Sequence, residues 1–149
     1  MALLLLSKGY NSPQHPMAPP ASTILLVEDD RSLRNSLSQF LNDNGYRTLQ
    51  ADSARQGWEI ALARHPHLCL LDLNLPDGSG LDLLKKLTDA HLQTRVIVMT
   101  AFDLHHARPQ NGLLAGWLIK PVNPVELLKL VESVMGPQFS RSDGGAASP

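Results

Sequence analysis

The sequence predicts an α/β fold in which helices cover both faces of a five-stranded parallel sheet. Short, continuous apolar runs, typical of strands buried on both faces, alternate with segments in which apolar residues recur at helical spacing. Acidic residues, a threonine and a lysine each follow directly after one of these runs. The alternation favours right-handed crossovers between parallel strands, whose carboxyl ends all lie along one edge of the sheet.

Length and composition indicate one domain. The 149 residues, 43% of them apolar, can build one well-buried core but leave no room for a second domain of ordinary size. We expect the folded domain over residues 23–136. The proline-rich segment 1–22 and the polar segment 137–149 contain too little apolar surface to order themselves, so we predict a flexible leader and a flexible tail.

Charge and hydropathy argue against two classes of partner. The formal net charge is -1 and the basic residues are scattered, so we expect no direct binding to nucleic acid. No apolar run approaches the ~20 residues that span a bilayer. We therefore expect no membrane association and a cytoplasmic location. The only cysteine, Cys69, lies within an apolar run and is interpreted as a small buried hydrophobe.

The first predicted strand is the apolar run of residues 23–27, and a helix follows it. Asp30 is a suitable N-cap for this helix, because its carboxylate can accept hydrogen bonds from the free N–H groups of the first turn. Apolar residues then recur at helical spacing until Asn44 and Gly45 end the element. The second strand is expected over residues 46–50.

The middle of the chain predicts a helix, a buried strand and another helix. Ser53 can cap a helix over residues 54–64. The apolar run of residues 68–71 forms the third strand, and a loop with proline and glycine follows it. Leucines recur at helical spacing over residues 81–87 and indicate the next helix.

The last part of the domain contains two strands and a well-marked helix. Residues 96–99 form the fourth strand and residues 117–119 a short fifth strand. The final helix is expected to have Asn123 as its N-cap, Pro124 at its first position and Gly136 after its last turn.

Five residues with chemically active side chains follow the predicted strands. Glu28 and Asp29 follow the first strand, Asp72 the third, Thr100 the fourth and Lys120 the fifth. Because these strand ends meet at one edge of a parallel sheet, we expect one pocket to collect all five residues. Three carboxylates would repel one another unless a cation neutralised them, and their hard oxygen atoms suit Mg²⁺.

The same pocket suits a phosphoryl group. Mg²⁺ binds phosphate oxygens, Lys120 would add a second positive charge, and the hydroxyl of Thr100 could donate a hydrogen bond. In such a site Asp72 can act as a nucleophile and form an aspartyl phosphate.

With these motifs the sequence resembles the receiver domains of two-component response regulators, the CheY-like fold. The matching motifs are Glu28-Asp29, the segment LDLNLPDGSG that begins at Leu71 and contains Asp72, Thr100-Ala101 and Lys120-Pro121. The resemblance covers residues 23–135 and implies a flavodoxin-like, doubly wound (βα)5 sheet with strand order 2-1-3-4-5.

The resemblance implies a role for each residue of the site. Asp72 would be the phosphoacceptor; Glu28, Asp29, Asp72 and the backbone carbonyl of Asn74 would hold Mg²⁺. Thr100 and Lys120 would contact the phosphoryl group. The expected donor is a sensor histidine kinase or a phosphotransfer protein, and a downstream output protein or domain would respond to the change. We expect a signalling domain, not a metabolic enzyme.

The sequence departs from the family pattern in two places. Trp117 occupies the position of the switch aromatic, where tyrosine or phenylalanine is usual. The segment between Thr100 and Lys120 is short and contains Pro109, and a proline inside a helix costs roughly 3 kcal/mol or more. We therefore expect the fourth helix to be short or irregular.

Two other functions are compatible with part of the site. A haloacid-dehalogenase-type phosphatase also forms an aspartyl phosphate, but it needs a second aspartate two residues after the nucleophile, where this chain has Asn74. A receiver-shaped interaction module that works without phosphorylation would fit the short fourth-helix segment and Trp117. The complete set of acidic, threonine and lysine residues favours a phosphorylated receiver over this alternative.

Overall fold

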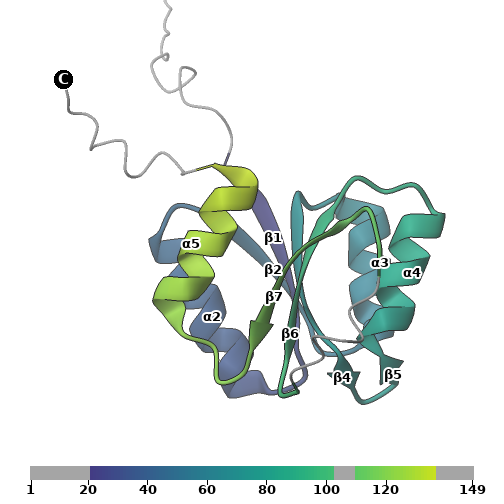
Figure 1. Cartoon of the computed structure of the whole chain (residues 1–149), viewed down its shortest axis with the longest axis horizontal. Helices are drawn as coiled ribbons and strands as arrows, with labels where there is room; N and C mark the ends of the chain where they lie inside the picture. The colour runs from purple at the N-terminus through teal and green to yellow at the C-terminus, as the bar shows by residue number, and fades with distance from the viewer. Residues whose placement is uncertain (1–20, 103–109, 137–149) are drawn as a thin grey trace, which may run out of the picture.

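The computed structural model describes residues 21–102 and 110–136, which form a five-stranded parallel sheet with two helices on each face (Figure 1). The strands lie in the order β2-β1-β3-β6-β7. This order confirms the predicted doubly wound α/β fold. The strands are β1 (Thr23–Val27), β2 (Arg47–Ala51), β3 (Leu68–Asp72), β6 (Arg95–Thr100) and β7 (Leu114–Ile119), and the helices are α2 (Arg31–Asp43), α3 (Ala54–Arg64), α4 (Gly80–Asp89) and α5 (Pro124–Met135).

The predicted N-caps are confirmed for three helices. Asp30 accepts a hydrogen bond from the backbone N–H of Leu33 at the start of α2, and Ser53 caps α3 in the same way. At the start of α5, Asn123 accepts from two backbone N–H groups, and Pro124 begins the helix. These side chains satisfy donors that a helix leaves unpaired in its first turn, which is why the sequence could locate the helix starts.

The core consists of two layers, one on each face of the sheet. Neighbouring residues of β1 belong to opposite layers: Ile24 and Leu26 pack toward α2 and α5, and Leu25 and Val27 pack toward α3 and α4. All four are completely buried. Side chains alternate across a strand, and both faces are covered here, so the run has to be continuously apolar.

Strand ends and the loop after β3 differ from the sequence expectations. β2 lies one residue later than predicted, and β7 begins at Leu114 instead of Trp117. The segment expected as a loop contains a small antiparallel hairpin, β4 (Asn74–Leu75) and β5 (Gly78–Ser79). Two pairs of residues are too few to produce an alternating pattern that sequence analysis can detect.

Several predictions concern the parts of the chain outside the described ranges. The expected leader, apart from residues 21–22, and the expected tail lie there, as does Pro109 of the expected fourth helix. Residues 110–113, which precede β7, contain no helix. Among the described helices, none is both long and apolar enough to cross a membrane. Cys69 is fully buried in β3, as predicted, and burial raises the pKa of its thiol to about 12.

Candidate functional site

The register of the sheet brings the predicted site residues to one edge. Val27 pairs with Leu71 across β1 and β3, so Glu28 and Asp72 follow neighbouring positions. Asp72 pairs with Met99 on β6, and Thr100 pairs with the last residue of β7, directly before Lys120. The acids of β1 and β3 flank the point where the strand order reverses, the usual binding position in an open α/β sheet.

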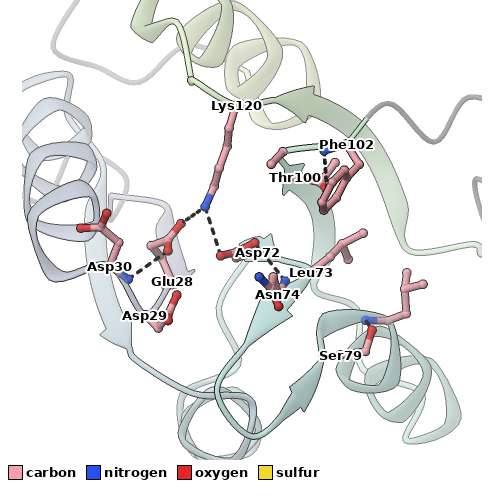
Figure 2. A pocket seen from close by; sticks show the side chains of 12 residues that line it. Glu28, Asp29, Asp30, Asp72, Leu73, Asn74, Ser79, Thr100, Phe102 and Lys120 are labelled. Atoms are coloured by element: carbon pink, nitrogen blue, oxygen red, sulfur yellow. Dashed lines mark hydrogen bonds and ion pairs between the residues drawn. The ribbon is translucent and has the colours of Figure 1, made fainter.

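Lys120 forms the central interaction of the site. Its Nζ atom donates to Glu28 Oε1 at 2.7 Å and to Asp72 Oδ2 at 3.1 Å (Figure 2). The lysine side chain is 22% exposed, whereas those of Glu28 and Asp72 are 1% and 6% exposed. The ammonium thus bridges two nearly buried carboxylates from different strands and stays accessible from the cavity side.

Burial and neighbouring charges shift the pKa values of Glu28 and Lys120. Burial raises the pKa of Glu28, the nearby Asp72 raises it further, and the hydrogen bond from Lys120 only partly opposes this. Burial alone would lower the pKa of Lys120, but its hydrogen bonds to Glu28 and Asp72 outweigh that effect and raise it. Lys120 is therefore held as the charged ammonium.

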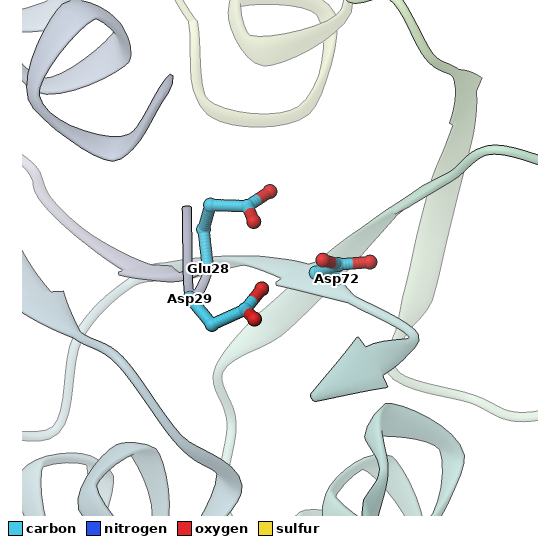
Figure 3. Close-up of side chains that lie close together, drawn as sticks. All are labelled: Glu28, Asp29 and Asp72. Carbon is cyan, nitrogen blue, oxygen red and sulfur yellow. The ribbon is translucent and has the colours of Figure 1, made fainter. Parts of the chain in front are cut away.

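The three carboxylates meet in one place. Glu28, Asp29 and Asp72 each offer an oxygen atom, and these atoms lie within 4.8 Å of one another. Figure 3 shows the three side chains pointing toward a common space. Asp29 is exposed and the other two are buried, so the cluster opens to solvent on the side of Asp29. This set of hard oxygen donors fits Mg²⁺, which takes carboxylates from protein and keeps several waters.

The loop after β3 lies beside the cluster. The backbone N–H of Asn74 donates to Asp72 Oδ1 at 3.0 Å, which fixes one oxygen of the central aspartate. The backbone N–H of Gly80 closes the loop by donating to the carbonyl of Leu73 at 2.9 Å. Asn74 itself is exposed and lines the cavity.

Thr100 lies on the opposite side of the cavity from the acidic pair (Figure 2). It is 2% exposed, and its hydroxyl oxygen accepts a hydrogen bond from the backbone N–H of Phe102 at 3.2 Å. Its carbonyl accepts from the backbone N–H of Lys120 at 2.7 Å, which holds the ends of β6 and β7 together. Trp117 is half-buried against the α3 and α4 layer and does not line the cavity, so its switch role stays a prediction.

All of the predicted site residues except Trp117 line one open cavity of about 800 Å³. Four acidic residues and one lysine line it among the described residues, so negative groups outnumber positive ones in the absence of a bound cation. A divalent cation and a phosphoryl group could occupy this space together. The lining residues are Glu28, Asp29, Asp30, Asp72, Leu73, Asn74, Ser79, Leu81, Thr100, Ala101, Phe102 and Lys120.

Two supporting residues were missed by sequence reasoning. Arg34 of α2 donates from its guanidinium to the backbone carbonyl of Glu28 at 2.8 Å and to the side chain of Gln50 at 2.9 Å. Asp77, in the loop after β3, accepts hydrogen bonds with its carboxylate from the first turn of α3. Both contacts cross between elements, and no spacing in the sequence points to them.

Comparison with known proteins gives a consistent result. A family model described as the response regulator receiver domain matches residues 24–132. The response regulator Rre1 of Synechocystis is 34% identical over 138 residues, which cover 89% of this chain. A solved CheY-like receiver domain protein from Methanospirillum hungatei is 30% identical, has a TM-score of 0.71, and the match covers 76% of this chain and 92% of that one.

The relatives are longer than the matched region. The nitrate/nitrite response regulator protein NarL of Escherichia coli is 32% identical over 127 residues, which cover 82% of this chain but 58% of NarL. The match to Rre1 likewise spans 59% of that protein. The similarity therefore concerns the part of these proteins that corresponds to the sheet and its cavity.

Proposed function

The chain belongs to the response regulator receiver domain family of two-component systems, and we propose that it is a phosphorylation-controlled signalling domain whose phosphoacceptor is Asp72. The observation that carries the proposal is the bridge from Lys120 to Glu28 and Asp72 beside the exposed carboxylate of Asp29. An acid that served only as a turn residue would not be buried and fixed in this way.

Mg²⁺ is the cofactor we propose. Glu28, Asp29 and Asp72, with the backbone carbonyl of Asn74, would hold it in the cavity. When bound, the ion would neutralise the carboxylates and the negative charge of phosphoryl oxygens. The distances among the three carboxylate oxygens support this proposal.

The proposed transfer starts from a phosphohistidine on a sensor kinase or a phosphotransfer protein. A carboxylate oxygen of Asp72 attacks the phosphorus atom, an O–P bond forms as the P–N bond breaks, and the departing histidine nitrogen keeps the electron pair of that bond. Lys120 and Thr100 would then donate to the phosphoryl oxygens. The domain would thus assist its own phosphorylation and dephosphorylation without being a metabolic enzyme.

Phosphorylation would alter what the chain binds. The phosphoryl group competes with the carboxylates for Lys120 and draws the hydroxyl of Thr100 away from the backbone of Phe102, with Trp117 on the neighbouring strand as the second switch residue. We propose that a downstream output protein or domain reads this change, without direct nucleic-acid or membrane contact by this chain. The proposed location is the cytoplasm, where such donors act.

The test is phosphate incorporation from acetyl phosphate, with and without Mg²⁺, resolved on a phosphate-affinity gel. We expect label in the wild-type chain that requires Mg²⁺, survives acid and is lost in base, as an acyl phosphate is. Asp72→Asn should abolish it. Asp82→Asn is the matched control, since Asp82 is exposed at the start of α4 and does not line the cavity. Wild-type protein that is folded yet takes no label would favour the phosphorylation-independent interaction module.

A further inference from the structure

The hairpin after Asp72 is attached at its tip to a helix that is distant in sequence. The hairpin consists of β4 and β5, and Asp77 lies in the turn between them. Asp77 Oδ1 accepts from the backbone N–H of Ala54 at 2.8 Å, and Oδ2 accepts from that of Arg55 at 2.9 Å. These are the first two residues of α3, whose N–H groups have no partner within the helix.

The contact is favourable for a carboxylate. The two backbone hydrogen bonds lower the pKa of Asp77, because they stabilise its charged form. The positive end of the α3 dipole acts in the same direction. Ser53 accepts from the next free N–H group, that of Gln56, at 3.1 Å. Asp77 and Ser53 together therefore accept hydrogen bonds from the first three N–H groups of α3.

The base of the hairpin is attached to the cavity. The N–H of Asn74 donates to Asp72 Oδ1, and Leu75 is buried in the α3 and α4 layer. The hairpin is thus held by the phosphoacceptor at one end and by α3 at the other. Figure 2 shows Asn74 directly beside Asp72, so a movement of the hairpin displaces a cavity wall.

Helix α3 is in turn fixed against the strand that leads to the acidic pair. A Cβ atom on Gly57 would lie 2.9 Å from the side chain of Val27, so helix and strand are in close contact there. The N–H of Glu28 donates to the carbonyl of Ala51 at 3.1 Å, just before α3 begins. Asp77 therefore links the Asn74 side of the cavity to the Glu28 side by a short chain of packed elements.

We infer that Asp77 is a positioning residue that sets the Mg²⁺ affinity of the cavity by holding the Asn74 hairpin against α3. The inference rests on the proposed function, because it assumes that the cavity binds Mg²⁺ and that the Asn74 carbonyl is a ligand. Groups that orient metal ligands typically change metal affinity by 10- to 100-fold when removed. Asp77 acts through backbone position and does not touch the metal.

The experiment is a MgCl₂ titration followed by the backbone amide NMR shifts of Asn74 and Gly80. Wild type is compared with Asp77→Ala, Asp77→Asn and Ser53→Ala. Asp77→Ala should raise the Kd for Mg²⁺ roughly tenfold, and Asp77→Asn should raise it less, because one acceptor oxygen remains. Ser53→Ala loosens the same helix turn without touching the hairpin, so its Kd should stay within about twofold of wild type. Amide hydrogen exchange of Ala54 and Arg55 reports the contact itself and should accelerate in Asp77→Ala.

The experiment separates failure of this inference from failure of the proposed function. Faster exchange at Ala54 and Arg55 with an unchanged Kd would overturn the inference and leave the proposed function standing. An equal loss of affinity in Ser53→Ala would also overturn it, since general loosening of α3 would then be the cause. A wild-type chain whose amides do not respond to Mg²⁺ would contradict the proposed metal site as well.

Discussion

At the scale of single residues, the site consists of charged side chains that are buried, although removing charge from water costs free energy. Glu28 and Asp72 are almost completely buried, and both accept a hydrogen bond from the ammonium of Lys120. Buried ion pairs add little net stability, since the cost of removing charge from water offsets their attraction. Burying these charges is consistent with a site in which Lys120 and Asp72 bind a phosphoryl group and a metal ion.

The lowered pKa of Asp77 predicts that the stability of the fold depends on pH. Its pKa lies below the usual value of 3.8, so the unfolded chain takes up the proton at a higher pH than the folded chain. Its contribution to stability is therefore present above pH 3.8 and lost as the pH falls through the lower, folded-state pKa. We expect the difference in free energy of unfolding between wild type and Asp77→Asn to be constant from about pH 7 to 5 and to shrink toward about pH 3.

Urea unfolding at each pH measures this difference. Asp82→Asn removes the same charge close by, but the Asp82 carboxylate accepts no hydrogen bond from the described residues, so it serves as the control. A wild-type advantage over Asp77→Asn that persists undiminished to about pH 3 would contradict the assigned hydrogen bonds.

At the scale of elements, the start of α4 is packed closely against the strand that ends at Asp72. A Cβ atom on Gly80 would lie 2.3 Å from the carbonyl oxygen of Asp72, a backbone atom that cannot rotate away. Only a glycine allows this approach. Gly80 is therefore required for steric reasons, in addition to any role it has in the turn.

Gly80→Ala is expected to destabilise the fold by about 2 kcal/mol or more, because helix and strand must move apart. Gly112→Ala is the matched control: a Cβ atom there meets nothing within 4 Å, so its effect should be close to zero. Thermal and urea unfolding of both variants measure the difference. Equal stability of the two variants would show that α4 can shift without cost.

At the scale of the whole molecule, strand order and register concentrate charge at one edge of the sheet. The side chains come from four strands, and Glu28 and Lys120 are 92 residues apart. Buried apolar runs anchor β1, β3 and β6, and Leu118 anchors β7, so the sheet holds mutually repelling carboxylates together. The folded state therefore contains the carboxylate cluster of the proposed cation site, which the unfolded chain does not have.

Mg²⁺ should consequently stabilise the protein. A ligand that binds only the folded state at about a hundredfold excess over its Kd adds about 2.7 kcal/mol to the free energy of unfolding. Differential scanning calorimetry should show a melting temperature that rises with MgCl₂, and Asp29→Asn should weaken the response by removing one ligand. NaCl at matched ionic strength is the control. An equal rise with NaCl would indicate general screening of the carboxylates instead of a site.

Most elements and their order could be predicted from the sequence, because buried strands and helix caps produce local patterns. The hairpin of β4 and β5 was missed because it is too short to produce one. The runs of β1 and β3 were visible from continuous apolarity, and Asp30, Ser53 and Asn123 marked helix starts by side-chain chemistry that acts within one turn. The convergence of Glu28, Asp72, Thr100 and Lys120 also followed, since parallel strands share one edge.

How these side chains pair could not be predicted, because the pairing depends on tertiary contacts. The two hydrogen bonds of Lys120, the support that Arg34 gives to the carbonyl of Glu28, and the contact of Asp77 with α3 all join elements distant in sequence. Such contacts depend on the distances between packed elements, which no local pattern encodes. The close approach of Gly80 to Asp72 belongs to the same class, because a glycine in a loop motif does not indicate which backbone it meets.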